Sequence, residues 1–122
     1  MATVITNTGK ALITGRFLSD SPLELYIGWG EGTGAAAPDD IALSSEAPEG
    51  RERANVAQVT TATQQDTIEA TATLMATGQR AITNAAIFDA ATNGNMIFKG
   101  DFLPVNLNTG DSITFSLKIQ LL

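Results

Sequence analysis

The chain has 122 residues, a formal net charge of −6 and 43% hydrophobic residues, which suits one compact domain with its own core. It contains no cysteine and no histidine, so disulfides, thiolate metal sites and the commonest general base are excluded. We therefore expect no enzyme, no cofactor and no bound metal. The seven lysines and arginines are scattered, which argues against nucleic-acid binding.

The N-terminal segment, residues 1–20, is the part of the chain predicted to be helical. Thr6 or Asn7 is a suitable cap for a helix over about Thr8–Phe17. The apolar side of this helix is expected to contain Leu12, Ile13 and Phe17. The segment has neither the leader pattern of a secreted protein nor the apolar run of about 20 residues that a membrane helix needs. We therefore expect no export signal and no membrane contact.

Six later segments have the features of β-strands. Strict alternation of apolar and polar residues is clearest in Thr67–Met75 and in Ser112–Leu121. The six segments are Leu23–Trp29, Arg53–Thr63, Thr67–Met75, Ile82–Phe88, Asn95–Leu103 and Ser112–Leu121. Their sequential order and short turns predict an all-β fold, an antiparallel sandwich or jelly-roll-like barrel, with residues 1–122 as a single domain.

Three details refine this expectation. The apolar positions within Arg53–Thr63 change phase, which indicates a bulge or twist. The segment Ile82–Phe88 is apolar on both faces, which is typical of a strand buried on both sides. Asn93-Gly94 predicts a hairpin turn that Phe88 and Met96 flank. The following strand is expected to place three apolar residues on one face, namely Met96, Phe98 and Phe102.

The long loop, residues 30–50, is the segment most suggestive of function. Between Gly28 and Glu49 the chain has four glycines and two prolines, and a loop of this length in a small domain is functional or disordered. It lacks the Gly-Lys-Ser/Thr ending of a phosphate-binding loop and the regular acidic spacing of a calcium site. A short helical turn near Ile41–Leu43 would hold it in place.

Other groupings of reactive or aromatic residues have ordinary explanations. The pairs Asp66/Glu69 and Asp89/Asp101 are surface charges rather than a catalytic pair. An aromatic platform for sugars is the remaining alternative, and its candidate residues are Tyr26, Trp29, Phe88, Phe98, Phe102 and Phe115. Because Trp29 follows the apolar face of its strand, core packing or an interface anchor is favoured for it.

The stretch from Leu25 to about Phe102 resembles small structural proteins of tailed bacteriophages. Tyr26–Gly34 is similar to their "I-G-x-G-T-G" strand end, followed by an Ala-Pro-Asp loop and a strand with an arginine, here Arg51 or Arg53. Ile82–Asp89 resembles their "I-x-E-A-G-I-F-D" strand, with Asn84 in place of glutamate and Ala86 in place of glycine. The resemblance implies a virion component, most like a capsid cement (decoration) protein.

Our main interpretation is therefore a protein on the capsid surface of the virion, made in the host cytoplasm, that clamps neighbouring capsid subunits. Its expected partners are the major capsid protein and further copies of itself, as a homotrimer. A tail or tail-fibre component is the alternative, and a carbohydrate-binding module is a further one. The loop Gly30–Glu49 and the N-terminal segment are expected to make the contacts. The candidate contact residues are Trp29, Glu31, Asp39, Asp40, Ile41, Leu43, Arg51 and Arg53.

Overall fold

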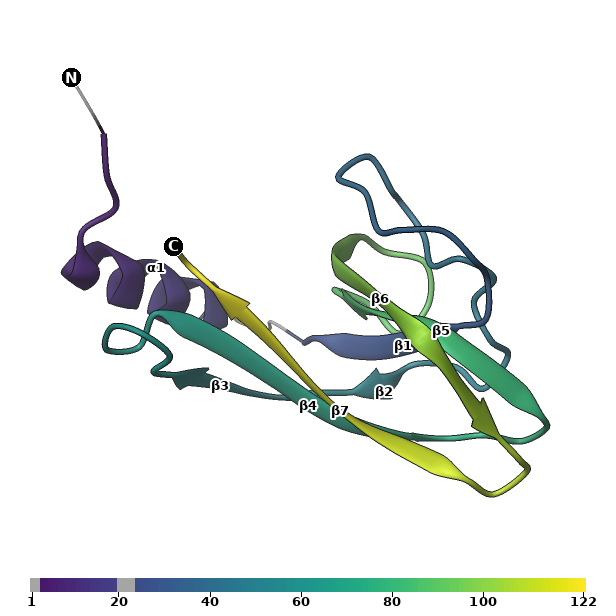
Figure 1. Ribbon diagram of the computed structural model, residues 1–122. Helices are drawn as coiled ribbons and strands as arrows, with labels where there is room; N and C mark the ends of the chain where they lie inside the picture. Colours follow the sequence, from purple (N-terminus) through teal and green to yellow (C-terminus); the bar gives the residue numbers. More distant parts are fainter. Residues whose placement is uncertain (1–2, 20–23) are drawn as a thin grey trace.

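The computed structural model describes residues 3–19 and 24–122. In this part of the chain, seven strands form two antiparallel sheets, and one helix lies at an end of the body (Figure 1). One sheet has the order β2-β1-β5-β6 and the other the order β3-β4-β7. The elements are α1 (Asn7–Ser19), β1 (Tyr26–Gly30), β2 (Glu52–Arg53), β3 (Asn55–Val59), β4 (Thr67–Met75), β5 (Arg80–Phe88), β6 (Met96–Leu107) and β7 (Ser112–Gln120). The predicted all-β sandwich is confirmed.

The core between the two sheets is built from small residues opposite large ones. In the β4–β7 pair, Ala72 lies opposite Phe115 and Ala70 opposite Leu117. The ring of Phe115 meets that of Trp29 edge-on, with 6.3 Å between the centroids, an arrangement that aromatic quadrupoles favour. The small apolar face of β4 therefore provides the space for the aromatic residues.

The phase change within Arg53–Thr63, predicted as a bulge or twist, is a passage from one sheet to the other. β2 pairs with β1, whereas β3 pairs with β4 in the opposite sheet. Ala54 between them is buried, and its N–H donates to the carbonyl of Leu25 at 2.8 Å. The residues on either side of Ala54 face different neighbours, so their apolar pattern shifts by one position.

The strand β5 is buried on both faces, as predicted. Its inner face contributes Ile82, Ala85 and Ile87 to the main core. Its outer face is covered by the chain's own long loop, because Ala86 and Phe88 form a second apolar cluster with Leu43. The loop therefore acts as a third layer over the first sheet.

The predicted hairpin between β5 and β6 is confirmed. Asn93 and Gly94 have φ angles of 56° and 70°, the pair of positive values that an Asn-Gly turn supplies. Phe88 lies opposite Met96. The expected shared face of Met96 and Phe98 is wrong, because a register shift beside this pair sends Met96 to the outer cluster and Phe98 to the main core.

The helix forms where predicted, but its buried face differs. Thr6 is the cap, since its hydroxyl oxygen accepts from the N–H of Gly9 at 3.0 Å. Phe17 packs against the core, whereas Leu12 and Ile13 are 57% and 48% exposed. A polar residue occupies the centre of the buried face instead, because the Thr14 hydroxyl donates to the carbonyl of Gln65 at 2.7 Å.

Some predictions concern residues outside the described part of the chain. These are the first two residues and residues 20–23, so the beginning of the predicted N-terminal segment and the start of the Leu23–Trp29 strand are not described. No described helix has the length and apolar character required to cross a membrane.

Candidate interaction surface

The long loop, residues 31–50, is held in a defined position over the outer face of the β2-β1-β5-β6 sheet (Figure 1). Backbone hydrogen bonds hold it beside β1, as Ala47 donates to the carbonyl of Trp29 in β1, and Glu31 and Gly32, which directly follow β1, donate to the carbonyls of Ser45 and Ser44. The expected helical turn at 41–43 does not form. Instead, Leu43 is buried and side chains from β5 and β6 fasten the loop.

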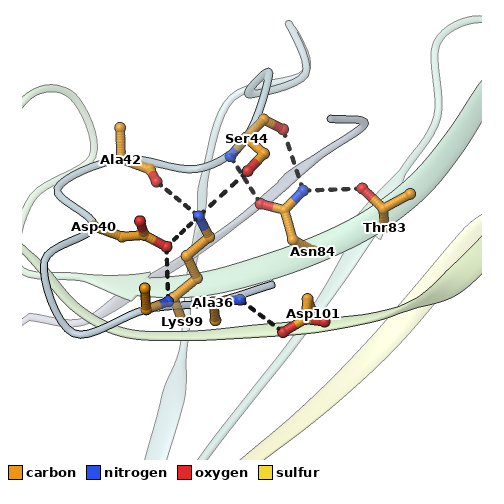
Figure 2. Close-up of polar contacts among 9 residues, drawn as sticks. Ala36, Asp40, Ala42, Ser44, Thr83, Asn84, Lys99 and Asp101 are labelled. Carbon is orange, nitrogen blue, oxygen red and sulfur yellow. Dashed lines mark hydrogen bonds and ion pairs between the residues drawn. The ribbon is translucent and has the colours of Figure 1, made fainter. Parts of the chain in front are cut away.

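Asn84 on β5 fastens the middle of the loop. Its carboxamide oxygen accepts from the N–H of Ser44 at 3.0 Å, and its nitrogen donates to the carbonyl of the same residue at 3.1 Å. Asn84 is almost fully buried, and Figure 2 shows it bridging Ser44 and Thr83. A glutamate carboxylate at this position would accept but could not donate when ionised. The asparagine therefore supplies both halves of this contact.

Lys99 on β6 fastens the loop from its other side. Its ammonium nitrogen lies 2.9 Å from an Asp40 carboxylate oxygen, 3.2 Å from the Ala42 carbonyl and 3.3 Å from the Ser44 hydroxyl (Figure 2). An ammonium has three donors, so these contacts satisfy it fully. The hydrogen bond from Lys99 also lowers the pKa of Asp40 below its usual value, with help from the N–H of Ala37.

The base of the loop is closed by Arg51. Its guanidinium lies 3.4 Å above the centroid of the Phe88 ring, a cation–π arrangement. It also forms two hydrogen bonds with the Glu46 carboxylate, at 3.0 and 3.2 Å. A further donor reaches the carbonyls of Ala90 and Asn93 in the β5–β6 turn. Arg51 therefore ties the loop to the hairpin.

A buried carboxylate at the end of the loop completes the scaffold. Glu49 accepts from the Trp29 indole at 3.2 Å, from the Arg80 guanidinium at 3.0 Å and from the backbone N–H of Thr77 at 3.0 Å. Burial raises the pKa of Glu49, but the Thr77 N–H and hydroxyl and the Arg80 side chain lower it further, so that it ends below its usual value. Glu49 is thus an ionised structural group that joins three segments.

These contacts divide the eight candidate contact residues into two groups. The inward group includes Trp29 and Leu43, which are buried, and Glu31, which is half-buried and accepts from the N–H of Ala81 through its carboxylate. It also includes Asp40 and Arg51, which form ion pairs within the protein. The outward group consists of Asp39, Ile41 and Arg53. Ile41 is 89% exposed. The surface that the loop presents is therefore its tip around Pro38–Ile41.

The anchoring residues Asn84, Lys99 and Arg80 were missed by sequence reasoning. A signal existed for Asn84 alone, because it is a polar residue within a strand predicted to be buried on both sides. Lys99 and Arg80 look like surface charges in the sequence. Their roles depend on segments that the fold brings together from 59 and 31 residues away.

A second exposed apolar surface was also missed. It lies on β6, where Phe102, Leu103 and Val105 are 37%, 87% and 39% exposed. Pro104 lies within this part of the strand, where the pairing with β5 shifts register between Asp101 and Val105. Proline lacks a backbone donor and is confined to edge strands, which is a signal that the sequence contained.

The described residues contain no group of three or more acidic side chains that could hold a metal ion.

What the fold and this site define is a small β-sandwich with a preorganised loop layer. A family model, the podophage GP4 fiber I protein gp80 family, matches residues 10–120. Because the match covers most of the chain, the protein belongs to this family. It is a bacteriophage structural protein, which assigns it to the virion. No curated protein matches the chain.

Proposed function

We propose that this protein is a fibre component of a podophage virion and that it acts by adhesion, without catalysis. The observation that carries the proposal is the match to a fiber I protein family over residues 10–120. It supports the tail-fibre alternative better than the capsid cement interpretation. Binding to the major capsid protein and a location on the capsid surface stay predictions. We include self-association in the proposal, with a trimer as the expected state.

The loop layer supports a binding role. A partner that contacts the Pro38–Ile41 tip meets a segment already ordered by Asn84 and Lys99. Binding through a preorganised surface loses less conformational entropy than binding through a flexible one. The exposed Ile41 side chain supplies apolar contact, and the exposed Asp39 supplies a charge suited to a basic partner.

The absence of catalysis is supported by the condition of the ionisable groups near the loop. Asp40, Glu49 and Asp89 are held ionised by hydrogen bonds, which lower their pKa values. A general acid or base at neutral pH needs the opposite shift for a carboxylate. The carbohydrate alternative has no specific support, since Trp29 is fully buried.

Immunogold electron microscopy of purified virions tests the location. Antibodies against the chain should label the tail region at its fibres. Label distributed over the shell would overturn the fibre proposal and favour the cement interpretation.

A deletion of the gene gives a second readout. Virions without the protein should keep the heat and low-salt resistance of their shells but lose adsorption to host cells, by tenfold or more. Loss of shell resistance with normal adsorption would contradict the proposal.

A further inference from the structure

The sandwich is open along one side, between β6 and β7. Each is the last strand of its sheet within the described residues. They follow one another in the chain, yet they belong to opposite sheets, and the residues between them, 108–111, connect them at one end alone (Figure 1). An edge strand has unpaired backbone N–H and C=O groups that another strand can use. This side therefore has two such edges facing one opening.

A groove of about 440 Å³ occupies the opening. Its apolar lining comes from Ala85, Phe98, Leu117 and Ile119, of which the last three are half-buried residues packed against the main core. Gly100 also lines it, and a side chain there would meet no atom within 4 Å. The groove is thus an apolar slot beside two free strand edges, which is the arrangement that accepts an added β-strand.

The chain also contains a strand-forming segment that belongs to neither sheet, which we call the arm, residues Thr3–Thr6, and its last residue caps α1. All four residues are threonine, valine or isoleucine, the β-branched types that favour strands over helices. The arm is neither helical nor paired with a strand. Val4 and Ile5 are 77% and 45% exposed, and the arm leads away from the helix and both sheets (Figure 1).

We propose that the arm of one copy adds as a β-strand to the groove between β6 and β7 of a second copy. The arm and the groove have compatible lengths. Ser116–Gln120 of β7 line the groove with five residues, or about 17 Å of strand, and the four-residue arm spans about 14 Å. Strand alternation would direct one of Val4 and Ile5 into the apolar slot.

The position of α1 argues for a second copy as the donor. The carboxamide of Gln58 on β3 donates to the carbonyl of Ala11 at 2.7 Å, which holds the helix on the β3 side. β3 and β7 are opposite edges of their sheet. The arm begins at the first turn of the helix and points away from both sheets (Figure 1), so it does not lie in its own groove.

The charges around the groove favour the uncharged arm over a charged segment of another protein. The groove lining contains two lysines and no carboxylate. Both lysines already have partners, Asp40 for Lys99 and Glu69 for Lys118. Residues 3–8 carry no charged side chain, so the added strand leaves no charge unpaired in the apolar slot.

The size of the contact indicates the form of the assembly. A stable interface needs about 800 Å² on each partner, or roughly 20–30 residues a side. One four-residue arm in one groove provides much less. We therefore infer a closed assembly in which every copy both donates an arm and accepts one, so that each copy makes the contact twice.

Engineered cysteines test the proposal directly, because the chain has none of its own. Gly100→Cys places a thiol in the groove without a clash. It is mixed, at high protein concentration and under mild oxidation, with a size-tagged Val4→Cys or Ile5→Cys chain. The expected result is a disulfide between the two chains, formed at least fivefold better by one arm position than by its neighbour, because successive strand residues face opposite sides. Ile41→Cys, on the exposed loop tip, is the matched control and should not crosslink to the arm.

A double variant with both cysteines in one chain identifies the donor. Arm exchange gives covalent oligomers on a non-reducing gel. An internally bridged monomer would show that the arm fills its own groove, and absence of any crosslink would show that the groove does not take the arm; either result overturns the proposal.

This inference rests on the self-association included in the proposed function, and the two fail separately. Light scattering of the unmodified protein reports whether an oligomer exists at all. An oligomer that forms without the arm crosslink would retain the proposed self-association and refute the arm exchange. Val4→Asp/Ile5→Asp should shift the oligomer to monomer with an unchanged circular dichroism spectrum, since both side chains are exposed.

Discussion

Asp66 shows how much structure one side chain can organise. It is fully buried in the turn between β3 and β4. Its carboxylate accepts from the backbone N–H groups of Thr61, Ala62 and Thr63, at 2.9 to 3.1 Å, and from the Thr67 hydroxyl at 2.9 Å. Burial alone would raise the pKa of Asp66, but these hydrogen bonds lower it far below its usual value. The sequence had indicated a surface charge at this position.

Asp66→Asn should destabilise the fold at neutral pH, because the amide group presents donors to the donors of the turn. We expect a Tm at least about 5 °C lower. The pKa of Asp66 is lower in the folded than in the unfolded state, so its stabilisation is complete above the unfolded value of about 3.9 and is lost as pH falls below it. Urea unfolding at pH 7 and pH 3 should therefore show a weaker acid dependence for the variant, and equal dependence would refute this role.

Lys99 is the second decisive residue, because it holds the loop through Asp40, Ala42 and Ser44. Lys99→Met keeps the aliphatic part of the side chain and removes its three hydrogen bonds. The amides of Ala37 and Ser44 should then exchange with deuterium at least about tenfold faster, as the loop opens more often. Lys118→Met is the matched control, since its ammonium is exposed and lies 3.7 Å from Glu69. Equal protection in both variants would show that Lys99 does not hold the loop.

At the scale of elements, the close approach between β1 and the long loop shapes the first sheet. Gly30 ends β1 and forms an isolated bridge with Glu46 of the loop. A side chain at Gly30 would come within 2.5 Å of the Ser44 carbonyl oxygen, so the glycine is required for the loop to lie this close. Leu43, Ala86 and Phe88 then form the apolar contact beneath it.

Gly30→Ala should lower the free energy of unfolding by about 1–3 kcal/mol, the cost of overpacking against a backbone atom. Gly100→Ala is the matched control, because its added methyl group meets no atom within 4 Å, and it should change stability by less than about 0.5 kcal/mol. Urea denaturation of both variants measures the difference. A Gly30→Ala protein as stable as the control would mean that the loop does not pack as described.

At the scale of the whole molecule, one core connects the two sheets. Its members come from β1, β4, β5, β6 and β7, among other segments, and they include Trp29, Leu74, Ile87 and Phe115. The loop layer is joined to this core through Glu49, which bonds Trp29. These connections predict that the sandwich and the loop unfold together.

Thermal unfolding should therefore be a single transition, consistent with one domain. Trp29 is the sole tryptophan of the chain and is fully buried, so its fluorescence reports the core while far-ultraviolet circular dichroism reports the strands. The two midpoints should coincide within about 1 °C, and calorimetry should give an enthalpy of about 85 kcal/mol near 60 °C. Separate transitions would indicate that the loop layer or the helix unfolds independently.

The sequence by itself determined the features that depend on neighbouring residues. Alternation in Thr67–Met75 and Ser112–Leu121 predicted β4 and β7 closely, because the two-residue period of a half-buried strand is local. Asn93-Gly94 predicted the hairpin. The absence of histidine and cysteine from the sequence excluded disulfides, thiolate metal sites and a histidine general base. The resemblance correctly indicated a structural protein of a bacteriophage. The family that matches is a fibre family, however, and not a capsid cement family.

Only the tertiary structure decided how the site is built. The loop's position depends on the pairs Lys99–Asp40 and Asn84–Ser44, whose members are 59 and 40 residues apart, and no local pattern identifies such partners. For the same reason Trp29 and Leu43, two of the expected contact residues, lie in apolar clusters while Ile41 is left exposed. The change of sheet at Ala54 and the open side between β6 and β7 likewise follow from which strands pair, and pairing is settled by long-range packing rather than by sequence period.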